Sequence, residues 1–190
     1  MGCWNRLSNV FYLFIILICR QSIRGHHDKI TDLAINDNNT VLMSSSEDGW
    51  IMFWDITPLQ LHQPPYYHLL GCACLHQRFV CQLKFDSVNQ LLYSVADDGY
   101  IHAWNIPLLD PLYQRFYNQI LTERELCVFS LNHSVNQVDL NSRSPNSVLF
   151  CDITPTGKYI ASGTHDGSIF IWKIPDIERD ERGLIKRVFS

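Results

Sequence analysis

The stretch that decides the fold is Asp48-Gly49-Trp50-Ile51-Met52-Phe53-Trp54, in which a turn signal precedes a short run of aromatic and β-branched residues. Such runs favour β-strands, and Asp-Gly between two of them is a strong hairpin signal because the turn requires a positive φ. The same spacing occurs twice more, from Asp98-Gly99 to Trp104 and from Asp166-Gly167 to Trp172. The chain therefore contains a threefold repeat of one strand-forming pattern.

The similarity between the three copies extends well beyond the turn. Residues 26–57 align without a gap onto 76–107 at a shift of 50, and onto 144–175 at a shift of 118. A register kept over about thirty positions predicts a repeat protein. We refer to the three copies as the first, second and third units.

Each unit predicts at least three antiparallel strands. In the first unit these are Ile30–Ile35, Val41–Ser45 and Trp50–Trp54, bounded by turn residues, and the other units follow the same pattern. A fourth, outer strand is expected in the segment after each Trp. The units are thus predicted to be small antiparallel meanders.

These units resemble WD40 repeats, the blades of a β-propeller. Arg24-Gly25-His26, followed by Ile30, Ser46, Asp48 and Trp54-Asp55, is similar to the full consensus of that family. The resemblance implies an all-β fold in which three recognisable blades of four-stranded antiparallel sheet form a partial propeller.

In that family a His, a Ser or Thr, the turn Asp and the Trp form a hydrogen-bonded structural network inside each blade. The resemblance places His26, Ser46, Asp48 and Trp54 in this network in the first unit, His76, Asp98 and Trp104 in the second, and Thr164, Asp166 and Trp172 in the third, with turn glycines Gly49, Gly99 and Gly167. Ala96 stands at the hydroxyl position of the second unit, and Ser144 at the His position of the third. We therefore expect one complete network and two partial ones.

The repeat sets the expected domain organisation. It comprises an apolar leader at 1–22, blades near 23–57, 76–107 and 144–175, a long inter-blade insertion at 108–143, and a charged tail or start of a next blade at 176–190. Propellers typically have four to eight blades, so three leave the ring open. We expect the missing blades to come from the rest of a longer chain, with closure by oligomerisation as the alternative.

The leader contains a ten-residue apolar run, Val10–Cys19. This run is too short for a transmembrane span, and none is expected. It has the length of the apolar part of a signal peptide but lacks a small-x-small cleavage site. A secretory signal, a core segment and a mis-joined sequence remain as alternatives.

Composition and motifs indicate a binding protein and not an enzyme. The net charge is −4, so no direct nucleic-acid binding is expected. The seven cysteines form no CxxC pair and have no His at zinc-ligand spacing, so no metal is expected. No catalytic set and no glycine-rich phosphate loop is present, so no catalytic residue and no cofactor is expected. His165-Asp166 is interpreted as turn chemistry.

The sequence therefore predicts a protein-protein interaction scaffold that binds protein or peptide partners. Insertions between blades map to loops that often carry binding, which makes Tyr113, Phe116 and Tyr117 the candidate partner-binding residues. Covering the side of the propeller is the alternative role for these aromatic side chains.

Ile23–Asn36 and Ser144–Thr164 are also similar to blades of the bromodomain-and-WD-repeat proteins. That resemblance implies a chromatin-associated protein, in the nucleus and not the cytoplasm, that affects transcription regulation and cell shape. One alternative is a substrate receptor of a cullin-ring ubiquitin ligase, although Trp54-Asp55-Ile56-Thr57 lacks the Trp-Asp-x-Arg pattern of such adaptors. The other alternative is a secreted or membrane-tethered propeller.

Overall fold

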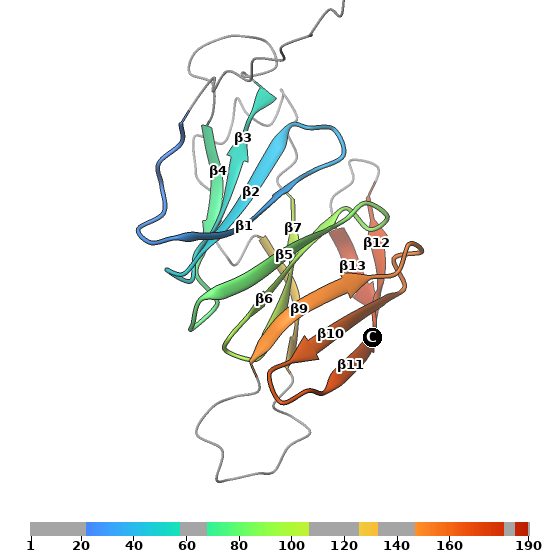
Figure 1. The fold of residues 1–190 in the computed structure, drawn as a ribbon. Helices are drawn as coiled ribbons and strands as arrows, with labels where there is room; N and C mark the ends of the chain where they lie inside the picture. The colour runs from blue at the N-terminus through green and yellow to red at the C-terminus, as the bar shows by residue number, and fades with distance from the viewer. Residues whose placement is uncertain (1–21, 58–67, 107–125, 133–146, 181–184, 190) are drawn as a thin grey trace, which may run out of the picture.

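The computed structural model describes residues 22–57, 68–106, 126–132, 147–180 and 185–189, which form a nearly all-β structure (Figure 1). The strands assemble into four antiparallel sheets. This confirms the predicted all-β fold of a partial propeller, with four-stranded antiparallel sheets in the first and second units. In the described residues the sheet of the third unit has three strands, without the expected outer strand.

Each unit of the repeat forms its own sheet, with neighbouring strands in chain order. The first unit contains β1 (Ile30–Ile35), β2 (Val41–Ser46), β3 (Ile51–Asp55) and β4 (His68–Ala73). The second contains β5 (Val80–Asp86), β6 (Leu91–Ala96), β7 (Tyr100–Asn105) and β8 (Cys127–Asn132). The third contains β9 (Val148–Ile153), β10 (Tyr159–Thr164) and β11 (Ile169–Lys173), and a separate hairpin contains β12 (Asp176–Arg179) and β13 (Ile185–Phe189).

The Asp-Gly turns are built in the same way in all three units. Gly49, Gly99 and Gly167 have φ values of 81°, 82° and 87°, a region that glycine adopts without strain. The preceding Asp closes each turn, as when Asp48 Oδ1 accepts a hydrogen bond from the backbone N–H of Trp50 at 2.9 Å. The recurrence of Asp-Gly thus has a direct geometric cause.

The predicted insertion at 108–143 contains the outer strand of the second unit. β8 lies within it and pairs with β7, with Cys127 opposite Trp104. The extra length is therefore divided between the connections before and after β8. Tyr113, Phe116 and Tyr117 lie outside the described residues, as does nearly all of the leader at 1–22.

The third unit ends differently from the other two. In the described part of the chain β11 pairs with β10 alone, and the chain then forms the β12–β13 hairpin. Ile177 and Ile185 of this hairpin pack against the apolar cluster between the second and third units. The segment expected to be a charged tail or a next blade thus contains a hairpin that folds back onto preceding units.

Two apolar clusters join the units. At the first junction Val41, Met43, Ile51 and Phe53 of the first unit pack against Val80, Leu83, Leu92 and Trp104 of the second. At the second junction Leu91, Tyr93, Val95, Ile101 and Ala103 of the second unit pack against Val148, Cys151 and Ile160 of the third. Removal of this apolar area from water is the main stabilising contribution at each junction.

The innermost strands β1, β5 and β9 contact one another in series (Figure 1). Asp32 Oδ2 on β1 accepts a hydrogen bond from the backbone N–H of Leu83 on β5 at 2.9 Å. Gln82 Oε1 on β5 accepts one from the backbone N–H of Cys151 on β9 at 2.9 Å. At each junction, therefore, a side-chain acceptor on the inner strand of one unit bonds to the backbone of the next unit's inner strand.

Among the described residues, no helix has the length and apolar character needed to cross a membrane.

Candidate functional site

The first unit contains a hydrogen-bonded chain of four side chains. His26 Nδ1 lies 3.2 Å from Asp48 Oδ2, and His26 Nε2 lies 2.7 Å from Ser44 Oγ. Trp54 Nε1 donates to the same Ser44 hydroxyl oxygen at 2.9 Å. The network therefore connects the segment before β1 with the Asp-Gly turn, β2 and β3.

The second unit contains the same network in full. His76 Nδ1 lies 3.0 Å from Asp98 Oδ2, and His76 Nε2 lies 2.7 Å from Ser94 Oγ. Trp104 Nε1 donates to Ser94 Oγ at 2.7 Å. Asp98 and His76 are buried, and Ser94 is fully buried.

These contacts correct the predicted hydroxyl position. Ser44 and not Ser46 bridges His26 and Trp54, whereas the Ser46 hydroxyl accepts a hydrogen bond from the backbone N–H of Asp48 at 3.2 Å. For the same reason Ala96 leaves no gap in the second unit, because Ser94 supplies the hydroxyl. The prediction of only one complete network was therefore wrong, since two are complete.

The third unit retains part of the network. Trp172 Nε1 donates to Ser162 Oγ at 3.4 Å, a longer contact than in the other units. Thr164 Oγ1 donates to Asp166 Oδ1 at 2.6 Å, so the turn Asp has a hydroxyl partner. Ser144, expected at the histidine position, lies outside the described residues.

The turn carboxylates are held in their ionised form. Burial alone would raise the pKa of Asp98, but His76 and the backbone N–H groups of Gln77 and Tyr100 together lower that pKa below its ordinary value. Asp48 shows the same balance, with burial opposed by the backbone N–H groups of His27 and Trp50 and by His26, and its pKa is also lowered. Both carboxylates therefore act as hydrogen-bond acceptors over the neutral pH range.

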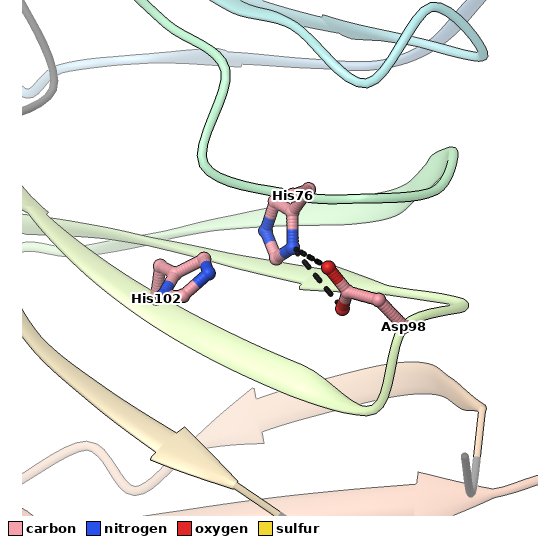
Figure 2. Close-up of side chains that lie close together, drawn as sticks. All are labelled: His76, Asp98 and His102. Carbon is pink, nitrogen blue, oxygen red and sulfur yellow. Dashed lines mark hydrogen bonds and ion pairs between the residues drawn. The ribbon is translucent and has the colours of Figure 1, made fainter.

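A second histidine extends the network of the second unit. Figure 2 shows His102 beside the His76–Asp98 pair, and the centres of the two imidazole rings lie 4.4 Å apart. The His102 ring also stacks on Tyr100, and His102 Nδ1 lies 2.6 Å from Ser130 Oγ on β8. Burial, followed by the nearby charge of His76, lowers the pKa of His102 to about 3. His102 is therefore a neutral side chain that connects β7 to β8.

Sequence reasoning did not identify His102 or Ser130 as network members. The repeat alignment places Met52 at the matching position of the first unit, so no recurrence marks the histidine. Ser130 lies on a strand that no Asp-Gly signal precedes. An apolar alternation in Cys127–Asn132 is the one sequence signal that could have located that strand.

His76, Asp98 and His102 are also the described residues whose chemistry is nearest to a metal site. Their potential ligand atoms lie within 4.8 Å of one another. A tetrahedral zinc ion holds ligand atoms about 3.5 Å apart, since each lies about 2.1 Å from the ion. However, the two ring nitrogens of His76 already contact Asp98 and Ser94, and the first unit forms the same contacts with a methionine in place of His102. The arrangement is therefore accounted for by a structural hydrogen-bond network.

The Ser-His-Asp order of each network resembles the connectivity of a hydrolase triad. A nucleophilic hydroxyl must reach substrate, but Ser44 is 4% exposed and Ser94 is 0% exposed. Each of these hydroxyls also accepts a hydrogen bond from a tryptophan indole. The geometry thus supports a role in holding strands together and not in covalent catalysis.

The network residues coincide with a known repeat family. The model of the WD domain, G-beta repeat matches residues 17–55, 71–105 and 126–173, and so contains the described His, Ser, Asp and Trp positions of all three units. No match to the chain was found among curated proteins. Because the family model covers more than half of the sequence, the chain belongs to the WD40-repeat family.

Proposed function

We propose that this chain is a non-enzymatic scaffold that binds a protein partner at the end of the second blade where its Asp-Gly turn lies. WD40 repeats support a protein-interaction role and are generally non-enzymatic. The observation that carries the proposed location is a pair of exposed apolar side chains, Leu75 and Phe79, which are 39% and 42% exposed. They lie in the loop between β4 and β5, on either side of the buried network residue His76, whose bonds to Asp98 and Ser94 hold this loop in place.

The surroundings of these side chains fit a protein interface. Arg78 Nη1 donates to Asp97 Oδ2 at 2.9 Å, and the backbone N–H of Asp97 donates to the Phe79 carbonyl oxygen. Interfaces combine an apolar or aromatic centre with a polar rim. We call Leu75, Arg78, Phe79 and Asp97 the turn-end patch.

The first blade packs against the segment that carries the turn-end patch. A Cβ on Gly49 would lie 3.3 Å from the His76 carbonyl oxygen and 3.4 Å from that of Arg78. The Asp-Gly turn of the first blade therefore packs closely against the segment that carries the patch. A preorganised surface of this kind loses little conformational entropy on binding.

The experiment compares partner recovery by three forms of the tagged chain. The double variant Leu75→Ser, Phe79→Ser should lose a defined set of proteins from a quantitative pull-down. The control Val88→Ser changes a side chain that is 58% exposed at the other end of β5 and should retain that set. Equal recovery by all three forms would place partner binding elsewhere on the chain.

A finer proposal is that the scaffold is nuclear and chromatin-associated. It is supported by the sequence resemblance of Ile23–Asn36 and of the third blade to bromodomain-and-WD-repeat proteins. Fractionation of cells that express the tagged chain tests this proposal, and recovery in the cytosol alone would contradict it. The tag belongs at the C-terminal end, so that residues 1–22 stay unblocked.

A further inference from the structure

The third blade exposes an apolar face that is buried in the other two blades. Tyr159, Ile169 and Ile171 are 45%, 78% and 72% exposed. The repeat alignment matches them to Leu91, Ile101 and Ala103 of the second blade, which are all 0% exposed, and to Val41, Ile51 and Phe53 of the first blade, which are at most 1% exposed. In the first and second blades the following blade covers this face. We call it the trailing face of the third blade.

The first blade exposes the apolar face that, in the other two blades, packs against the preceding blade. Ile30 and Leu33 on β1 are 50% and 57% exposed. Their counterparts in the second blade, Val80 and Leu83, are 0% and 4% exposed, and those in the third blade, Val148 and Cys151, are 0% and 5% exposed. In those blades the preceding blade covers the face. We call it the leading face of the first blade.

We propose that a second copy of this chain covers both faces, so that the trailing face of each copy packs against the leading face of the other. The two open faces are the repeat counterparts of faces that already meet at the two internal junctions. Two copies of three blades give a ring of six, within the range of four to eight that propellers use, whereas three copies exceed it. A two-fold ring also leaves neither face uncovered, as closed symmetry requires.

One departure from the repeat supports the pairing of these two faces. The position that supplies the acceptor at the internal junctions, Asp32 and then Gln82, is occupied in the third blade by Phe150, which is 67% exposed. At the leading face the matching backbone N–H, that of Leu33, already donates to Asp32 Oδ1 at 2.8 Å. The new junction therefore needs no acceptor at this point, and Phe150 adds apolar area to it.

The C-terminal hairpin leaves the trailing face open. Arg179 on β12 donates from Nη2 to the Asn89 carbonyl oxygen at 2.7 Å and from Nη1 to Asn105 Oδ1 at 3.3 Å. The hairpin is thus attached to the second blade, while Ile169 and Ile171 on β11 stay exposed. A second copy can approach β11 without displacing it.

The test uses residues 1–190 and measures their mass in solution by sedimentation. The wild-type chain should sediment as a dimer. Leu33→Asp and Ile169→Asp each place a charge in one face, and each should weaken self-association by at least about 100-fold, because an unpaired charge is costly to bury. Val88→Asp, which lies on neither face, is the control and should remain dimeric. Circular dichroism checks that all variants keep their sheet content.

Mixing the two variants distinguishes this geometry from other dimers. The Leu33→Asp chain keeps an intact trailing face, and the Ile169→Asp chain keeps an intact leading face. An equimolar mixture should therefore form a dimer through one restored junction, although neither variant does so alone. A monomeric wild type at tens of micromolar would overturn the proposal and leave the faces to further blades of a longer chain. So would a Leu33→Asp chain that still dimerises, because the contact would then join two identical faces. Neither result bears on partner binding at the turn-end patch, which the pull-down measures separately.

Discussion

At the scale of single residues, one hydroxyl connects three parts of the first blade. Ser44 Oγ accepts from Trp54 Nε1 and contacts His26 Nε2, which places the turn carboxylate of Asp48 at the end of a continuous chain of bonds. Removing the hydroxyl takes this shared partner away from two buried groups, the Trp54 indole N–H and His26 Nε2. Such groups cost more than the net value of the bonds they lose.

We expect Ser44→Ala to lower the free energy of unfolding by about 2–4 kcal/mol, since two buried polar groups lose their hydroxyl partner. Ser46→Ala removes a single contact to the Asp48 backbone and should cost about 1 kcal/mol or less. Urea denaturation of both variants measures the difference. Equal losses would show that Ser44 has no special position in the network.

Gly25 is required by a close approach of the Trp54 indole. A Cβ at this position would overlap the Trp54 ring and lie 3.1 Å from Met52 Sδ. We expect Gly25→Ala to destabilise the first blade by roughly 1–3 kcal/mol, because the ring must shift in a packed site. Gly163→Ala is the matched control, since a Cβ there meets nothing within 4 Å. A thermal midpoint that falls equally in both variants would contradict this explanation.

The sequence contained the correct hydroxyl position, but the family resemblance favoured another. Serine recurs at 44, 94 and 162, the same position in all three units, whereas 46, 96 and 164 hold Ser, Ala and Thr. Both positions fall on the same strand two residues apart, so they face the same way in the alternation. The register of β2 against β3, which the sequence does not display, decides which hydroxyl meets the tryptophan.

At the scale of the element, β7 carries a buried histidine whose surroundings oppose its charge. His102 is 4% exposed and lies among His76, Asp98, Tyr100 and Trp104. Its pKa is about 3 in the folded chain, below the ordinary value of 6.5. Below pH 6.5 the unfolded chain therefore binds a proton that the folded chain does not. Protonation of this site therefore does not lower the free energy of unfolding above pH 6.5, but lowers it progressively as the pH falls from 6.5 toward 3.

We expect His102→Met, which installs the residue found at the matching position of the first blade, to flatten this dependence. One proton changes the free energy of unfolding by at most about 1.4 kcal/mol per pH unit. Between pH 6 and 4 the free energy of unfolding of the variant should therefore fall less steeply than that of the wild type, by up to this amount per pH unit. Urea midpoints across this range measure it. Ser130→Ala is the control, because it removes the bond to His102 Nδ1 but keeps the titrating ring. An unchanged slope in His102→Met would show that another group causes the acid sensitivity.

The strands joined by an Asp-Gly turn could be predicted from the sequence. The strands without such a turn could be predicted only in part. β2 with β3, β6 with β7 and β10 with β11 form the expected hairpins, because alternation and a turn signal coincide there. β8 follows β7 only after residues 106–126, so no local signal shows which strand it joins. β12 and β13 are rich in charged residues, and their pairing depends on packing against a distant blade.

At the scale of the whole molecule, the number of blades could be predicted but their contacts could not. Ile101 and Ile169 are the same residue at the same repeat position, yet one is 0% and the other 78% exposed. The difference arises from the presence or absence of a neighbouring blade, which is not a property of the local sequence. Whether an apolar side chain on a blade face is buried therefore depends on the neighbouring blade, and the repeat sequence alone does not decide it.

The side-chain acceptors between blades give the last prediction. Asp32→Ala removes the acceptor for the Leu83 amide at the first junction, and Gln82→Ala removes that for the Cys151 amide at the second. Each change should speed hydrogen exchange of its own amide by about tenfold, which corresponds to about 1.4 kcal/mol of local opening. Mass spectrometry of peptides that cover Val80–Asp86 and Val148–Ile153 separates the two sites. Each variant serves as the control for the other, because the two junctions share β5 but use different acceptors. Exchange that rises equally at both junctions in each variant would show that the three blades open as one cooperative unit.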